Sequence, residues 1–125
     1  MRRGWLTLAG LMVTTGAAAH HSFAVFFDTE SKVVKVTGVV KEFNFSNPHG
    51  VITLVVGKAG GSTLWRAETN SPSILRRHGW TAQSLHVGDK ITIEGWAARD
   101  GTQYMRLKSA NRPDGSLIGR PLGAS

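Results

Sequence analysis

The chain of 125 residues contains no cysteine. This absence excludes disulfide bonds, thiolate redox chemistry and zinc sites built on cysteine. Acidic side chains are also scarce, because 8 Asp and Glu stand against 15 Lys and Arg and give a formal net charge of +7. A basic balance suits an anionic partner such as an envelope surface or an acidic polymer. The basic residues are scattered along the chain, so the charge is a weak guide to function.

Long hydrophobic runs are missing as well. The most apolar stretch, residues 5–13, is too short to span a bilayer, but it follows two arginines and precedes the small residues 16–19. This order is typical of a secretory signal peptide over residues 1–19. We predict cleavage after Ala19, with Ala18 as the alternative. We therefore expect a periplasmic or secreted protein with no transmembrane anchor after processing.

Five β-like runs follow, with one helical interruption between the third and the fourth. The runs cover residues 32–46, 50–57, 62–69, 90–98 and 102–110. In the helical interruption, Ser71 has the position of an N-cap, Pro72 is the first helical residue and Gly79 ends the helix. The first run is long, and its alternation of apolar residues changes phase near Gly38, which indicates a bulge.

Three strands, a short helix and two further strands form the order of an OB-type barrel. We therefore predict a mainly β fold, a small five-stranded OB-like barrel over residues 32–110. An extended N-terminal segment, 20–31, is expected before it and a loose C-terminal tail, 111–125, after it. An open Greek-key or sandwich-like arrangement is the alternative.

The second and third runs predict a hairpin in which Leu54 pairs with Trp65 in the core. The same register places His49 opposite Asn70 and diagonal to Glu68 on the outer face. Three interpretations of this polar end stay open. Its residues can hold the local backbone of the Asn-Pro-His turn, contact a ligand or partner, or bind a metal, since imidazole with carboxylate suits zinc or copper.

For the last two runs, alternation favours pairing of Ile93 with Leu107 and of Gly95 with Met105. That register requires a three-residue loop, and residues 99–101 match one.

The sequence carries no nucleophile elbow, phosphate-binding loop or HExxH motif, and no acidic pair placed for acid–base catalysis. A single-stranded nucleic-acid site would need aromatic residues interleaved with basic ones along two strands. Here Trp65 belongs to the predicted core, and the outer face of that hairpin carries Arg66 alone as a positive charge. We therefore expect neither an enzyme nor a nucleic-acid-binding protein.

Two adjacent histidines, His20 and His21, follow the predicted signal segment. After cleavage at Ala19, His20 would offer its α-amino nitrogen and its imidazole to one metal ion. After cleavage at Ala18, a histidine in third place would bind copper or nickel through the amine and the intervening amides. Alternatively, the pair simply follows the processing site and has no function.

A mobile pair supplies few ligands, so a metal site needs a third group, for which His49 is the candidate. Residues 20–31 span at most about 40 Å, which brings His49 near the limit of their reach. The aromatic residues of 23–27 are expected to dock this terminus on the barrel.

The motifs AHHSF, NPH, WRAE and GW, followed by L..GD, occur in this order along the chain. This order resembles a family of short exported bacterial proteins of unknown function with a predicted OB-like β-barrel, over most of the mature chain. The matching positions are His20, His21, His49, Trp65, Glu68, Gly79, Trp80, Gly88 and Asp89. The resemblance implies export and a small barrel, and it implies no activity. The chain departs from the family pattern near the Asn-Pro, where Phe45 stands in place of an expected Trp.

Together these observations predict an exported, non-enzymatic binding protein that binds a transition metal, copper first and zinc second. The predicted metal ligands are His20, His21, His49 and Glu68. The alternative is an interaction module without metal, in which a face that includes Asn47, Arg66 and Asn70 binds an envelope protein or a glycan.

Overall fold

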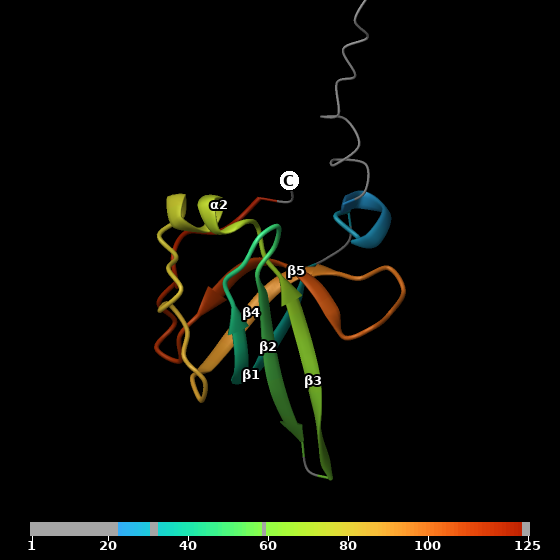
Figure 1. The fold of residues 1–125 in the computed structure, drawn as a ribbon. Coiled ribbons are helices and arrows are strands. Elements are labelled where there is room, and N and C mark those ends of the chain that lie inside the picture. The colour runs from blue at the N-terminus through green and yellow to red at the C-terminus, as the bar shows by residue number, and fades with distance from the viewer. Residues whose placement is uncertain (1–22, 31–32, 59, 124–125) are drawn as a thin grey trace, which may run out of the picture.

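The computed structural model describes residues 23–30, 33–58 and 60–123. Five strands form a closed barrel in the order β1-β2-β3-β5-β4 (Figure 1). The elements are β1 Val34–Asn44, β2 Val51–Lys58, β3 Gly61–Glu68, α2 Pro72–Arg77, β4 Lys90–Ala97 and β5 Tyr104–Asn111. The predicted mainly β barrel, with one short helix between the third and fourth strands, is confirmed. The predicted signal segment lies outside the described residues.

Strand β1 serves two neighbours because it is long and bent. Its residues 34–39 pair with β4 and its residues 39–44 pair with β2, both antiparallel. The register shifts between Val40 and Glu42, so the bulge lies just beyond the predicted position. Gly38 instead allows close approach, since a Cβ there would lie 2.7 Å from the carbonyl oxygen of Val55.

The hairpin of β2 and β3 follows the predicted register. Leu54 pairs with Trp65, and Val51 pairs with Glu68. Alternate side chains of the strands therefore point into one core, whose largest fully buried members are Trp80, Ile52, Leu54, Leu75, Ile93, Met105 and Leu107. The predicted cap is also present, because the Ser71 hydroxyl accepts from the backbone N–H of Ile74.

The predicted register of β4 and β5 is wrong by two residues. Gly95 pairs with Leu107 rather than Met105, and a bulge between Glu94 and Gly95 changes the offset further along the strands. No side chain fits at Gly95, because a Cβ there would overlap the Arg106 carbonyl. The connection spans residues 98–103 instead of three residues.

The C-terminal tail is packed rather than loose. Ile118 and Leu122 are buried, and their backbone N–H groups donate to the carbonyl oxygens of Ala110 and Lys108 at 2.8 and 2.7 Å. Residues 112–123 therefore complete the core, in contrast to the prediction for 111–125. Within the part of the chain that the structure describes, no helix combines the length and apolar character needed to cross a bilayer.

Candidate ligand-binding site

His49 enters the site from the connection between β1 and β2. This connection contains a cis peptide bond between Asn47 and Pro48, and His49 follows directly. The His49 Nδ1 atom lies 3.1 Å from the Thr69 carbonyl oxygen and 3.3 Å from Nη1 of Arg106. A carbonyl oxygen only accepts and a guanidinium only donates, so one nitrogen cannot bond both in the same tautomer. We assign a proton to Nδ1, because the carbonyl lies closer and Arg106 already donates to Glu68.

The Glu68 carboxylate lies at the centre of a group of polar side chains. Its Oε2 accepts from the Tyr104 hydroxyl at 2.7 Å, and its Oε1 accepts from Nη1 of Arg106 at 2.9 Å. The Nε2 atom of His49 lies 3.6 Å from the same Oε1. These contacts arise because β3 and β5 are parallel neighbours, with Glu68 in register with Arg106. We call His49, Glu68, Tyr104 and Arg106 the polar cluster.

Burial controls the charges in the polar cluster. The Arg106 side chain is only 3% exposed, whereas that of Glu68 is 21% exposed. Burial lowers the pKa of Arg106, and the adjacent Glu68 carboxylate opposes that shift. Burial also raises the pKa of Tyr104, as does its hydrogen bond to Glu68. The phenol therefore stays protonated as a donor, while a carboxylate and a guanidinium form a largely enclosed ion pair.

The N-terminal segment docks beside this cluster. Residues 23–26 form one helical turn rather than the predicted extended chain. The Phe23 ring centroid lies 5.2 Å from the guanidinium carbon of Arg106, and the Phe27 ring stacks on Tyr104 at 5.7 Å. Both rings thus contact residues that bind the Glu68 carboxylate. The aromatic docking predicted from the sequence is confirmed for the described residues.

Backbone contacts fix the same segment to the connection between β4 and β5. Phe27 forms an isolated bridge with Ala98, and the backbone N–H of Asp28 donates to the Ala97 carbonyl at 2.9 Å. Arg99 adds a side-chain bond, since its Nε donates to the carbonyl oxygen of Ala24 at 2.8 Å. Residues 24–28 therefore lie beside the connection between β4 and β5 (Figure 1).

The structure confirms the predicted positions of some site residues and contradicts that of Asn70. His49 and Glu68 are neighbours, as predicted. Asn47 and Arg66, which precede them by two residues each, are exposed. Asn70 is 2% exposed, so its placement on the outer face was wrong. Strand β3 ends at Glu68, and alternation no longer applies where the chain turns toward α2.

His20 and His21 lie outside the described residues. Among residues 23–30, 33–58 and 60–123, no group of three or more His, Asp or Glu side chains is placed to hold a metal ion. The described part of the chain thus supplies two candidate ligands, His49 and Glu68.

Sequence reasoning missed Tyr104 and Arg106. The signal for them was present, because both alternate with the core residues Met105 and Leu107 and therefore lie on the other face of β5, where Arg106 is nevertheless buried. What the pattern lacks is the closure of β3 on β5, which brings Arg106 to Glu68.

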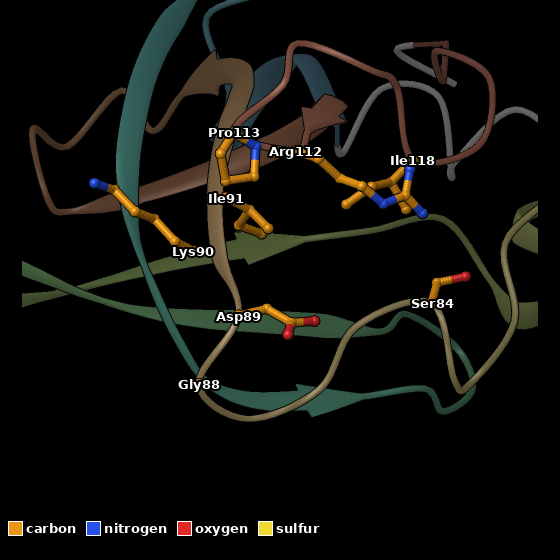
Figure 2. Close-up of a pocket in the computed structure, with 8 residues that line it drawn as sticks. All are labelled: Ser84, Gly88, Asp89, Lys90, Ile91, Arg112, Pro113 and Ile118. Atoms are coloured by element: carbon orange, nitrogen blue, oxygen red, sulfur yellow. The ribbon is translucent and has the colours of Figure 1, made fainter.

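A separate pocket of about 350 Å³ lies between the start of β4 and the turn after β5. Ile91 and Ile118 supply apolar walls, and Asp89 and Arg112 supply charges. Figure 2 shows the Asp89 carboxylate pointing into this space and the Lys90 ammonium pointing away from it. None of the predicted ligands lines the pocket, so it is distinct from the polar cluster.

The model of a family described as a family of unknown function (DUF6152) matches residues 9–106. The chain belongs to this family. No curated protein matches the chain. Two crystal structures of Rim1, a mitochondrial single-stranded DNA-binding protein from S. cerevisiae, are similar to it. The first has a TM-score of 0.51 at 12% identity over 74% of this chain and 99% of that chain. The second, with selenomethionine, has a TM-score of 0.50 at 13% identity over 75% and 100%. At such identity the likeness establishes the fold, and it agrees with the OB-type barrel predicted from the sequence.

Proposed function

We propose that the protein is exported and binds a transition metal, copper in preference to zinc, without catalysing a reaction. The ligands are His20 and His21 together with His49, and Glu68 completes the set. The observation that carries this proposal is the docking of Phe23 on Arg106, which itself contacts His49 and Glu68. His21 and His20 precede Phe23 by two and three residues, which span at most about 7 Å and about 11 Å, so the docking of Phe23 supports a site that combines these histidines with the polar cluster.

The hydrogen bonding of His49 supports a ligand role. A metal-binding histidine usually donates its second ring N–H to a carbonyl or carboxylate, which fixes the ring and raises its basicity. In this protein the Thr69 carbonyl accepts from Nδ1, and Nε2 faces Glu68. The Nε2 lone pair is then available for a metal in the neutral ring.

Glu68 fits the proposal as an oriented carboxylate. Tyr104 and Arg106 each occupy one of its oxygens, and each oxygen keeps a further lone pair. The two donors therefore fix the carboxylate without preventing it from binding an ion. The polar cluster also lies in the region of an OB-type barrel that commonly binds oligonucleotides or oligosaccharides, namely strands 2 and 3 and the connections between strands 1 and 2 and strands 4 and 5.

The test requires protein with its naturally processed N-terminus, loaded with copper and assayed for bound metal after removal of the excess. We expect His20→Ala with His21→Ala to abolish uptake and His49→Ala to weaken affinity at least about tenfold, which corresponds to about 1.4 kcal/mol. His86→Ala is the matched control, since the His86 side chain is 70% exposed beside Asp89 and far in sequence from the site. Uptake by the wild type no greater than by the double variant would refute metal binding.

An interaction module without metal remains the alternative, favoured by the exposure of Arg66 and Asn47 on the outer side of the barrel. Such a module binds an envelope protein or an acidic glycan through this face. Arg66→Ala would then weaken binding to an acidic oligosaccharide while leaving copper uptake unchanged. The metal proposal predicts the reverse pattern for His49→Ala.

A further inference from the structure

Five of the eight residues of strand β3 lie on a free edge. The strand pairs with β2 along its whole length, but it pairs with β5 only through residues 66–68. In the described part of the chain, no strand lies on the second side of residues 61–65. Figure 1 shows this part of β3 extending beyond the barrel, with β2 on one side only.

The backbone groups on this edge can be identified from the hydrogen-bond pattern. The N–H of Arg66 donates to the Gln103 carbonyl at 3.1 Å and thus points toward the β5 side. Alternate residues of a strand direct their N–H and C=O groups to the same side, so those of Ser62 and Leu64 face the free edge. Proteins usually protect such an edge with a charge, a proline or a bulge. The segment GSTLW, residues 61–65, contains no charged residue and no proline.

We propose that β3 pairs antiparallel with β3 of a second copy of this chain through residues 61–65. The two-fold axis passes through Thr63, which faces the partner subunit's Thr63. Ser62 then exchanges two backbone hydrogen bonds with Leu64 of the partner subunit, and symmetry doubles the number to four. The two barrels share a continuous sheet across this axis.

Side chains along the edge favour a second copy as the occupant. The register places Trp65 opposite the partner's Gly61. A Cβ at Gly61 would meet no atom within 4 Å, and the Trp65 side chain is only partly buried within one chain. The indole fills the space over the glycine, as aromatic residues do when they cover a glycine on a neighbouring strand. Leu64, 41% exposed in the single chain, lies on the opposite face of the sheet, where the register places it beside the partner's Ser62.

Electrostatics permit this pairing. Because residues 61–65 are uncharged, the two-fold axis brings no like charges opposite each other within the ladder. The proposed ladder between the two copies ends at Trp65, because β5 pairs with β3 from Arg66 onward. The free segment and the proposed ladder therefore have the same length.

Thr63→Cys tests the two-fold axis directly. The chain has no other cysteine, so any disulfide joins two copies at this position. Opposed residues of a non-hydrogen-bonded antiparallel pair have Cα atoms about 4.5 Å apart, within the range of a disulfide. We expect mild oxidation to convert most of the variant into a covalent dimer. Ser73→Cys, at an exposed position on α2, is the control and should remain largely monomeric.

Leu64→Pro tests the hydrogen bonds. The N–H lost at this position points away from β2, so the hairpin within one chain keeps its ladder. Sedimentation over a roughly hundredfold dilution series should show wild-type dimers that dissociate and a Leu64→Pro variant that stays monomeric. Leu64→Lys should raise the dissociation constant of the dimer, because the two lysines become diagonal neighbours across the two-fold axis and lose the apolar contact of Leu64, and this variant covers the case in which the proline variant does not fold.

Two results would overturn the proposal. One is a wild-type protein that sediments as a monomer throughout, with Thr63→Cys oxidising to dimer no faster than Ser73→Cys. The other is a dimer whose dissociation constant is unchanged in both Leu64→Pro and Leu64→Lys, which would place the contact on a different surface.

Discussion

Burial, rather than distance, should determine how much an ion pair stabilises this protein. The chain contains a matched comparison, because Lys35 and Glu94 lie 2.8 Å apart while Arg106 and Glu68 lie 2.9 Å apart. The Lys35 side chain is 65% exposed, whereas that of Arg106 is 3% exposed. Water and salt screen the first pair strongly and the second pair weakly.

The expected magnitudes differ accordingly. Glu94→Gln removes an exposed pair and should lower the free energy of unfolding by less than about 1 kcal/mol. Glu68→Gln leaves the Arg106 charge buried without a counter-ion, which costs about 3–5 kcal/mol. For a domain near 100 residues, the loss at Glu68 corresponds to a fall in melting temperature of at least about 12 °C.

Urea unfolding of the wild type and the two single variants measures these costs, provided that the m-value stays constant. The double substitution Glu68→Gln with Arg106→Met removes the stranded charge. It should therefore cost clearly less than the sum of the two single substitutions. Equal losses for Glu68→Gln and Glu94→Gln would refute the reasoning that burial dominates.

Three further predictions concern Tyr104, Gly119 and the C-terminal tail. Because the pKa of Tyr104 is raised in the folded state, its stabilising contribution is complete below the ordinary phenol value of about 10 and is lost as the pH rises above it. Urea unfolding across this range should show the loss in the wild type and a smaller one in Tyr104→Phe, and the phenolate absorbance of this single tyrosine reports the titration directly. Gly119→Ala should lower the melting temperature for two reasons, since Gly119 has a φ of +66° and an added Cβ would overlap Trp80. Gly115 has a similar φ but open space around it, so Gly115→Ala measures the cost of the backbone conformation without the steric overlap. Deletion of residues 112–123 should expose Trp80 and abolish cooperative unfolding, whereas a loose tail would be removed without loss.

The sequence predicts the β2–β3 register well because a one-residue slip would reverse every side chain, and only one parity buries Leu54 and packs Trp65 against the core. It fails for β4 and β5 because a shift of two residues preserves the parity. Both offsets bury Met105 and Leu107, so the apolar pattern cannot distinguish them. The longer connection is instead ordered by a local contact, in which the Asp100 carboxylate accepts from the hydroxyl of Thr102 at 2.7 Å.

Residues whose environment comes from distant parts of the chain escape a local pattern altogether. Ile118 and Leu122 lie among glycines and prolines with no strand or helix periodicity, and only the folded barrel determines that Ile118 is buried while the adjacent Leu117 is exposed. The burial of Arg106 depends similarly on Phe23, which reaches it from the far end of the described chain. His49 and Glu68 were predictable as neighbours because the register of a single hairpin, β2 with β3, determines the positions of both residues.

The short parallel pairing of β3 with β5 has a consequence for how the barrel opens. Only three residue pairs, from Arg66 with Tyr104 to Glu68 with Arg106, join these strands, whereas β2 and β3 share eight. The cheapest opening fluctuation of the barrel should therefore separate β3 from β5, and it must break the bonds of Glu68 to Tyr104 and Arg106. The side-chain bonds of the polar cluster thus hold β3 and β5 together where few backbone bonds do. A ligand bound to the cluster should therefore slow the exchange of the backbone amides between β3 and β5 with solvent.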